Sequence, residues 1–337
     1  MPCQRKKTLF GAEAGKGLPI GNLNSQFFAN VYLDGLDQFV KHELHCRYYL
    51  RYCDDFVLLN NDPEVLRDWR ARIESYLHDE LALELNPKQR LAPVSNGVDF
   101  LGYIVRRDYK LVRRRVVNNL KSKLASYEAR LVSAPENLRC YRFDQVQLDA
   151  LASTLSSYLG HFKPAASWRL RKALWQRFPY LEQYFDFDLG QWKLVRKTPL
   201  PTHLNTVRRQ YRYLRWRFPQ DALFFRVGRF YECYDIREPH WVVRLGLKRM
   251  RWTRRGACWG FPVRQLERNL AALLSDSFSV LLIDEREEQY GRPRMRVPVC
   301  RLVPGKRNHL AASPDIAAME PKGVGRSARS ARRAKRP

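Results

Sequence analysis

Residues 47–59 read RYYLRYCDDFVLL, two short runs of aromatic and branched side chains separated by Cys53, Asp54 and Asp55. Two β-prone runs joined by a few turn residues predict a β-hairpin, here with both carboxylates at its turn. Phosphoryl transfer by two metals needs carboxylates on a rigid support, close enough together to hold two Mg²⁺ ions. Aspartate is also common in ordinary turns, so these residues alone fit either a catalytic turn or a purely structural one.

The segments around this hairpin alternate between helical and strand patterns. Residues 24–44 repeat apolar side chains at near-helical spacing, and Asp62 followed by Pro63 is typical of a helix start. Residues 98–105 form a further strand-like run. This alternation predicts an α+β module over residues 1–110.

The rest of the chain is expected to form four parts. Residues 111–197 carry leucine stripes at helical spacing and predict a helical domain, and residues 198–204 predict a linker. Residues 205–305 combine a basic aromatic helix with strand-like runs, which predicts a small mixed α/β domain. Residues 306–337 are rich in Ala, Ser, Gly and Arg and predict a disordered basic tail.

The charge of the chain is strongly positive and unevenly distributed. Its 337 residues carry 61 basic and 34 acidic side chains, for a net charge of +27. Residues 1–110 are balanced, with 15 of each kind, whereas residues 201–305 carry 21 basic and 10 acidic side chains. Aromatic side chains lie among these arginines, where bases could stack on them, so a nucleic-acid partner is favoured over a generic cationic surface or binding to acidic lipids.

Cysteine spacing and hydropathy indicate the compartment. The seven cysteines form no C-x-x-C pair, which argues against a zinc site or a disulfide framework and favours a reducing, cytoplasmic setting. The uncharged stretch 17–33 contains several amide side chains, so no membrane segment is expected.

The order of motifs around the hairpin resembles reverse transcriptases of the bacterial retroelement type. Residues 17–26 read GLPIGNLNSQ before the hairpin, and residues 100–103 read FLGY after it. The resemblance implies that Asp54 and Asp55 are the catalytic residues and bind the metal, and that Leu101 and Gly102 lie near the primer grip. It also implies that incoming nucleotide and template are lined by Pro19, Gly21, Asn22, Ser25, Gln26 and Tyr52.

Residues 157–161, SYLGH, and 168–171, WRLR, resemble the helical thumb of the same family. The resemblance spans residues 8–190. It implies a palm over residues 1–110 and a thumb over residues 111–197, with Mg²⁺ in a two-metal site. The implied partners are template RNA, a DNA primer or hybrid, and dNTPs.

The loop of residues 17–26, which the resemblance places beside the incoming nucleotide, narrows the resemblance to one group of these enzymes. It reads Ile20-Gly21 and then Ser25-Gln26, where most such enzymes carry Gln-Gly and Ser-Pro. This variant resembles diversity-generating retroelements, whose enzymes copy a template RNA with errors at adenines. It implies an error-prone RNA-directed DNA polymerase, a nucleotidyltransferase for which a retroelement accessory protein is a further candidate partner.

The chain also departs from this family. Related enzymes carry an upstream fingers region with a third metal-binding Asp, whereas residues 1–16 contain no Asp. We therefore expect a C-terminal portion of such an enzyme, with a two-metal site one ligand short and little polymerase activity by itself. The alternative is a non-catalytic nucleic-acid-binding accessory protein or a gene fragment.

The basic segment resembles a second family. Residues 218–232 read FPQDALFFRVGRFYE and resemble the start of the mismatch-recognition domain of MutS proteins. Residues 259–262, WGFP, and 280–285 resemble a later turn and the last strand of that domain. The resemblance covers residues 205–305 and implies mismatched duplex DNA as a further partner.

Two residues of this segment would carry the recognition. The resemblance implies that Phe230 wedges into the duplex at a mispair and that Glu232 hydrogen-bonds the displaced base. Arg229 replaces the usual Asp of the family, which favours general phosphate affinity over mismatch selectivity. From the residues alone, Phe230 could also be a core aromatic and Glu232 a surface charge.

Overall fold

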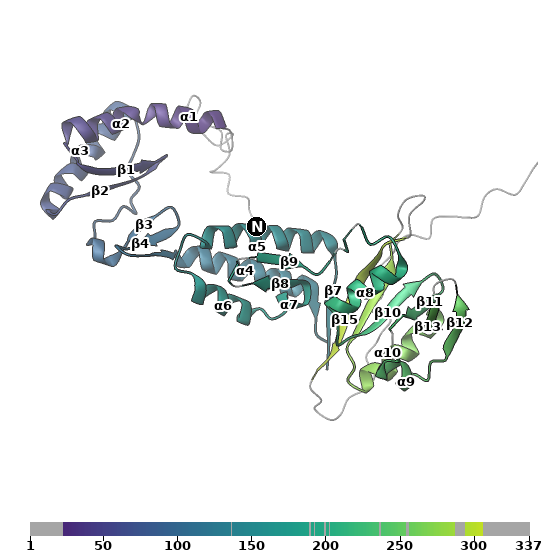
Figure 1. Cartoon of the computed structure of the whole chain (residues 1–337). Coiled ribbons are helices and arrows are strands. Elements are labelled where there is room, and N and C mark those ends of the chain that lie inside the picture. Colours follow the sequence, from purple (N-terminus) through teal and green to yellow (C-terminus); the bar gives the residue numbers. More distant parts are fainter. Residues whose placement is uncertain are drawn as a thin grey trace, which may run out of the picture. The chain divides into compact units, whose positions relative to one another are not determined.

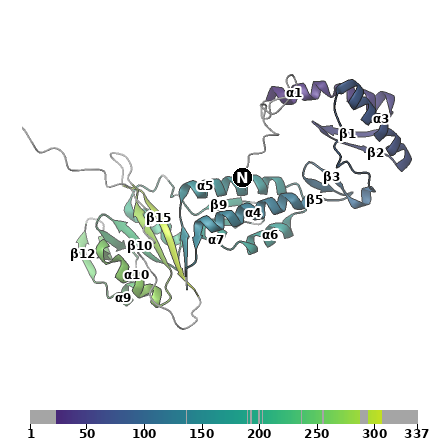
Figure 2. The same ribbon diagram turned by 180° about the vertical axis from the view of Figure 1, so that it is seen from behind.

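The computed structural model describes residues 23–305 apart from residues 136, 189, 192, 199, 202, 236, 254, 255 and 287–293. The chain divides into two units, Met1–Arg113 and Arg114–Pro337 (Figures 1 and 2). The predicted loop residues Pro19, Gly21 and Asn22 and the predicted tail 306–337 lie outside the described residues. Within the described ranges, no helix combines the length and apolar character that crossing a membrane requires.

The first unit packs helices against a hairpin. Its helices are α1 (Leu23–Tyr32), α2 (Asp34–Gln38), the π-helix η3 (Phe39–Glu43) and α3 (Pro63–Leu81). The helix expected over residues 24–44 is thus interrupted at Leu33. Asp62 caps α3 by accepting a hydrogen bond from the Glu64 backbone N–H, which confirms the predicted helix start. The buried core consists of Leu36, Val40, Leu44, Cys46, Trp69, Ile73 and Leu77.

The predicted hairpin is confirmed. β1 (Tyr48–Tyr52) pairs antiparallel with β2 (Asp55–Leu59), and Tyr52 lies opposite Asp55. One face of this two-stranded sheet packs on the core through Tyr49, Phe56 and Leu58. The other face is exposed at Tyr48, Leu50 and Tyr52.

A second sheet of the first unit contains β3 (Val98–Phe100), β4 (Tyr103–Val105) and β5 (Lys110–Val112). The prediction of a single strand over residues 98–105 is therefore wrong. Leu101 and Gly102 have φ values of 51° and 83°, and positive φ at both turn positions is typical of a tight type I′ hairpin turn.

The second unit begins with a helical part. The leucine stripes lie on α4 (Arg114–Leu131) and α5 (Gln145–Phe162), followed by α6 (Trp168–Arg177), which confirms the predicted helices. α4 and α5 pack against each other (Figures 1 and 2). The Tyr180 hydroxyl, just before the short α7 (Leu181–Tyr184), donates to the Leu124 carbonyl of α4 at 2.9 Å.

Strands interrupt this helical part. They are β6 (Val132–Ser133), β7 (Leu138–Arg142), β8 (Phe185–Asp188) and β9 (Lys193–Arg196). In β7, Leu138 and Cys140 are buried and Arg139 between them is exposed. This alternation is typical of a strand with one face on the core, not of a helix.

One eight-stranded sheet of order β12-β13-β11-β10-β14-β15-β7-β6 runs through the second unit. Its six further strands are β10 (Ala222–Val227), β11 (Phe230–Cys233), β12 (Arg249–Thr253), β13 (Gly256–Pro262), β14 (Val280–Glu285) and β15 (Arg296–Pro304). β10 and β14 are parallel, and the other neighbouring strands are antiparallel.

Helices cover both faces of this sheet. On α8 (Val207–Arg217), Tyr211 packs against Phe225 with 5.3 Å between ring centroids. On α9 (His240–Arg244), Trp241 packs against Phe224 at 5.9 Å. Successive strand residues point to opposite faces, so α8 and α9 lie on opposite faces of β10. α10 (Leu266–Ser275) contacts β14 and β15 and lies beside α9 in both views (Figures 1 and 2).

β7 joins the helical part to the strand-rich part. It pairs antiparallel with β15 along its whole length. Phe143, the next residue, packs edge-on against Tyr184 of α7 and Phe218 after α8. Residues 111–197 and 205–305 therefore share one sheet and one core across the expected linker, and the boundaries expected between them stay a prediction.

We expect a polypeptide of residues 205–305 to melt roughly 5–10 °C below one of residues 114–305. Removal of β7 leaves β15 as an open edge strand, which favours aggregation, and uncovers buried side chains. Thermal denaturation of both polypeptides, followed by circular dichroism, measures the difference. Equal melting temperatures of two monomeric polypeptides would show that residues 205–305 fold without β7.

Candidate nucleic-acid interface

Phe230 lies at an exposed hairpin tip. Val227 of β10 pairs with Phe230 of β11, so Gly228 and Arg229 form a two-residue turn. Gly228 has a φ of 62°, a left-handed conformation that glycine adopts without steric cost. Arg229 is exposed, and Phe230 keeps 38% of its surface accessible. The ring is therefore not a core side chain and can reach a ligand.

Charged side chains of β10, β14 and β15 hold this tip. Glu285 accepts hydrogen bonds from the Gly228 backbone N–H at 3.1 Å and from Arg296 at 2.6 Å. Burial raises the pKa of Glu285, but the Gly228 N–H and Arg296 outweigh it, so the pKa lies below its usual value of 4.5. Arg226 pairs with Asp284 at 2.8 Å and donates to the Gly228 carbonyl at 3.2 Å. The turn is thus anchored through both its N–H and its carbonyl.

Glu232 lies two residues beyond Phe230 on the same face of β11 and is buried. Its carboxylate accepts a hydrogen bond from the Tyr234 hydroxyl. It lies opposite Gly260 of β13, where an added Cβ would come within 2.6 Å of the Tyr231 carbonyl oxygen. Glu232 is therefore not a surface charge, and its contact with a displaced base stays a prediction.

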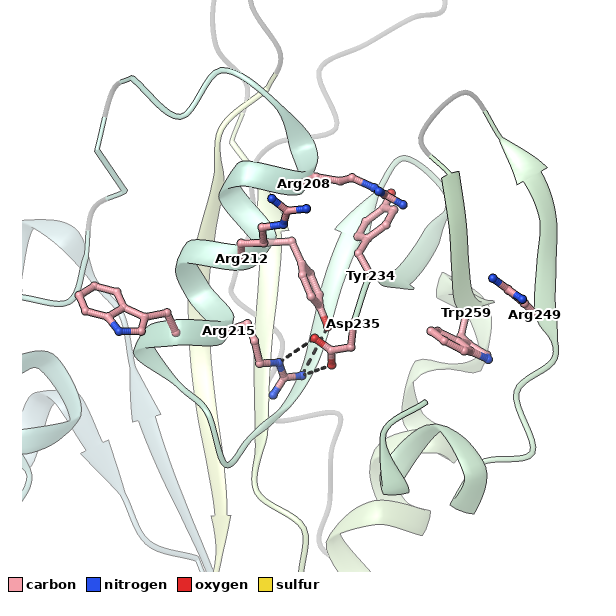
Figure 3. Close-up of a pocket in the computed structure, with 9 residues that line it drawn as sticks. Arg208, Arg212, Arg215, Tyr234, Asp235, Arg249 and Trp259 are labelled. Carbon is pink, nitrogen blue, oxygen red and sulfur yellow. Dashed lines mark hydrogen bonds and ion pairs between the residues drawn. The ribbon is translucent and has the colours of Figure 1, made fainter. Parts of the chain in front are cut away.

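A pocket of about 480 Å³ opens between α8 and the strands, beyond the other end of β11 (Figure 3). Arginines and aromatic side chains dominate its walls. Figure 3 shows Arg208, Arg212 and Tyr234 on one side and Arg249 and Trp259 on the other. The complete lining is Arg208, Tyr211, Arg212, Arg215, Trp216, Tyr234, Asp235, Arg249 and Trp259.

Arg215 neutralises the acidic residue of this pocket. Its Nε donates to Asp235 Oδ1 at 3.1 Å, and its Nη2 lies 3.0 Å from Asp235 Oδ2 (Figure 3). Its Nη1 also donates to the Asp221 carbonyl at 2.8 Å. These bonds fix Arg215 in place as part of the pocket wall. Arg212 and Arg249 supply positive charge to the pocket.

Asp54 and Asp55 lie at the turn between β1 and β2, and both are exposed. Cys53, the first turn residue, has a φ of 51°, which is uncommon for a non-glycine residue. Tyr52 lies opposite Asp55, so the structure brings Tyr52 and the two aspartates together at the turn. The positive φ of Cys53 persists only where the surrounding structure fixes it.

Arg51 fixes this turn. Its Nη1 donates to the Cys53 carbonyl and to the Asn30 side chain of α1, both at 2.9 Å. Its Nε and Nη2 bind Asp37 of α2 at 2.8 Å and 2.5 Å, and the Tyr49 hydroxyl donates to the same carboxylate at 2.7 Å. The hydrogen bond from Arg51 keeps the pKa of Asp37 below 3.8 although burial raises it. Asn30 and Asp37 lie 21 and 14 positions before Arg51, so no local sequence pattern indicates this cluster.

The remaining predicted site residues lie on other elements. Ser25 and Gln26 belong to α1, which the Arg51–Asn30 hydrogen bond joins to the turn. Leu101 and Gly102 form the tip of the β3–β4 hairpin in the other sheet of the first unit. Their roles in nucleotide, template and primer binding stay predictions.

The carboxylate turn fits Mg²⁺ in ligand type. Mg²⁺ prefers oxygen ligands and usually takes one or two protein carboxylates besides substrate phosphates. Throughout the described part of the chain, no group of three or more His, Cys, Asp or Glu side chains could hold a metal ion. Asp54 and Asp55 supply two carboxylates, and their binding of Mg²⁺ stays a prediction.

Comparison with known proteins concerns the second unit. Residues 205–305 match the family model of MutS domain I. The match covers the Phe230 tip and the strands β10 to β15, and it supports the MutS-like interpretation of this segment. No curated protein matches the chain.

We expect Asp37→Asn to flatten the acid dependence of stability. Because folding lowers this pKa, the charged pair stabilises the protein above pH 4, and the effect is lost as the pH falls through the lower folded pKa. At pH 7 the variant should lose about 1–3 kcal/mol of unfolding free energy. Urea denaturation between pH 7 and 3 measures both effects.

The matched control is Asp68→Asn, which removes an exposed carboxylate 4.0 Å from Arg72 on α3. It should leave the stability at pH 7 within about 0.5 kcal/mol of the unmodified chain. An acid dependence that is the same in the Asp37 variant and the unmodified chain would contradict a stabilising role of the Arg51–Asp37 pair.

Proposed function

We propose that this chain is a nucleic-acid-binding protein whose residues 205–305 bind DNA, with a preference for mispaired or otherwise distorted base pairs. The observation that carries this proposal is the exposed Phe230 ring on an anchored tip, inside the segment that matches MutS domain I. An apolar ring that enters between base steps must unstack them, which costs least where pairing is already weak. Arg229, exposed beside it, would attract the phosphates.

The anchoring of the tip supports insertion rather than passive contact. A wedge that yields on contact would not separate two stacked bases, so its support must be rigid. Glu285 holds the Gly228 N–H and Arg226 holds the Gly228 carbonyl, both from strands inside the sheet. The proposed Glu232 contact would require its carboxylate to exchange the Tyr234 hydrogen bond for one to a base.

We further propose that residues 8–190 take part in RNA-directed DNA synthesis, of the error-prone type found in diversity-generating retroelements. The supporting observation is the exposed carboxylate pair Asp54 and Asp55, on a turn that Arg51 fixes to two helices. In this proposal residues 1–110 are the palm and residues 111–197 the thumb. Mg²⁺ would bind at the carboxylates, with template RNA, a DNA primer and dNTPs as partners, in the cytoplasm.

A non-catalytic accessory protein is the alternative function. The supporting observation is that, within the described ranges, Asp54 and Asp55 belong to no larger cluster of side chains that could bind a metal ion. Both functions use the basic surface of the second unit. They differ in whether the carboxylate turn supports nucleotide addition.

We expect Phe230→Ala in the full chain to abolish the preference for a duplex with one mispair over its perfectly paired counterpart. Loss of the ring removes the wedge but no charge, so affinity for the perfect duplex should change less than about twofold. Fluorescence anisotropy with both duplexes gives the ratio of the two affinities. Phe230→Leu, which keeps an apolar side chain, should retain part of the preference.

The matched control is Trp168→Ala, which removes another exposed aromatic ring, on α6. It should leave the mismatch preference unchanged. Thermal denaturation separates the wedge from a structural role, because a core aromatic would cost about 3–5 kcal/mol on truncation. A large loss of stability in Phe230→Ala, or no mismatch preference in the unmodified chain, would contradict the wedge.

We expect the chain alone to show little Mg²⁺-dependent extension of a DNA primer on an RNA template. A complementing polypeptide that carries the Asp-bearing fingers of such enzymes should restore it. Asp54→Asn should then reduce the restored rate by at least roughly a hundredfold, because a metal ligand neutralises charge in the transition state. Asp108→Asn, an exposed carboxylate elsewhere in the first unit, should leave the rate unchanged.

Primer extension assays with labelled primer measure these rates. Robust extension by the chain alone would contradict the need for a further ligand. No extension with a folded complementing polypeptide, or full activity in Asp54→Asn, would contradict the polymerase proposal.

A further inference from the structure

We infer that the pocket between α8 and β13 binds an unpaired nucleotide of single-stranded DNA or RNA, at a site separate from the Phe230 tip. The inference rests on the proposed nucleic-acid-binding function and adds a second, chemically different contact to it. It follows from the charge, the aromatic walls and the size of the pocket described above.

The charge of the pocket suits a phosphate group. Arg212 and Arg249 are exposed, and over the described ranges neither forms an ion pair with a carboxylate. Arg208 lines the α8 side of the same pocket (Figure 3). Asp235 would repel a phosphate by itself, but its ion pair with Arg215 cancels that charge.

The walls of the pocket suit a base. Trp259 is half-buried on β13 and lines the pocket on the side opposite Tyr234 (Figure 3). Tyr234 is fixed by Tyr211, 5.5 Å away between ring centroids, and the guanidinium of Arg208 lies 5.7 Å from its ring centre. Rigid aromatic faces beside arginines are how proteins bind single-stranded nucleic acid without sequence preference.

The dimensions of the pocket agree with one nucleotide. Its volume of about 480 Å³ lies within the range of about 300–1,000 Å³ that small-molecule sites occupy. Bases within a duplex have both faces covered by their neighbours, so stacking on Trp259 requires a base outside the helix. An acidic peptide would use the arginines but gain nothing from the aromatic walls, and is therefore disfavoured.

The position of the pocket connects it to the proposed wedge. Phe230 begins β11, and Tyr234 follows directly after its last residue, Cys233. Four residues of extended chain span about 13 Å. A single strand that continues from the end of a duplex at Phe230 therefore has only a short distance to reach the pocket.

The test measures binding of the full chain to a labelled oligo(dT) strand by fluorescence anisotropy. Trp259→Ala should weaken this binding by about tenfold, as loss of one stacked base predicts, while Trp259→Phe should largely retain it. The double variant Arg212→Gln and Arg249→Gln should reduce the salt slope of log K by about 1.4, or about 0.7 for each lost phosphate contact.

Controls remove the same chemistry outside the pocket. Arg209→Gln removes an exposed arginine of the same helix, one that donates to Asn205 at 3.1 Å, and Trp168→Ala removes an exposed tryptophan of α6. The tryptophan control should bind oligo(dT) like the unmodified chain. Arg209→Gln should change affinity by less than half of the effect of the pocket arginines. Melting temperatures of all variants exclude unfolding as a cause.

The source of the nucleotide is tested by competition. Unlabelled oligo(dT) should displace the labelled strand far better than dTMP, because neighbouring phosphates add to the affinity of a strand. Equal competition at equal nucleotide concentration would assign the pocket to a free nucleotide and overturn the inference. Competition by poly-glutamate as strong as that by oligo(dT) would likewise overturn it, in favour of an acidic peptide.

The outcomes distinguish this inference from the proposed mismatch binding. Pocket variants should lose oligo(dT) affinity and keep the ratio of mispaired to perfect duplex, whereas Phe230→Ala should do the reverse. Unchanged oligo(dT) binding in folded pocket variants would overturn the inference. Equal weakening of single strands and perfect duplexes would also overturn it. If the unmodified chain shows no mismatch preference but the pocket variants selectively lose oligo(dT) affinity, the wedge is rejected and the pocket is retained.

Discussion

The second unit depends on the pairing of β15 with a strand on each side. β15 pairs with β14 along one edge and with β7 along the other, so it joins a segment of the helical part to the strands that match MutS domain I. Arg301 of β15 strengthens this junction by binding the buried carboxylate of Asp221 through two contacts of 2.8 Å. A buried carboxylate is stable only when paired, so Arg301 fixes the start of β10 relative to β15.

The same strand supports the exposed tip. Arg296, the first residue of β15, is buried and donates to Glu285, which in turn accepts from the Gly228 N–H. Gln210 of α8 accepts from the Arg296 backbone N–H at 3.2 Å, so the helix that carries the pocket arginines is tied to the same point. The geometry of Phe230 and of the pocket therefore both follow from where β15 begins, and a change at Arg296 would affect both sites together.

Local patterns in the sequence were sufficient for the elements but not for their partners. The hairpin at Asp54 and Asp55 and the cap at Asp62 depend on residues close together in the chain, and each could be predicted. The residues alone did not decide whether Phe230 is exposed, and only the resemblance to MutS proteins implied that it is. Glu285 contacts a residue 57 positions away, and nothing in its neighbourhood indicates that contact. β7 lies between two helices, and only its pairing with β15 reveals its place in the sheet. The pocket draws side chains from α8, β12 and β13, so sequence patterns could show its arginines and aromatics but not that they meet.

The two proposed contacts share a strand, and this limits how they can act. Glu232 of β11 lies between Phe230 and Tyr234 in the sequence, is buried, and is bonded to the Tyr234 hydroxyl. If the carboxylate turns towards a base at the tip, it must release that hydroxyl, which belongs to a wall of the pocket. If the hydroxyl instead stays bonded, Glu232 remains inside the protein, and recognition at the tip depends on the Phe230 ring alone. Binding at one end of β11 therefore bears on the polar contacts available at the other end, through one hydrogen bond.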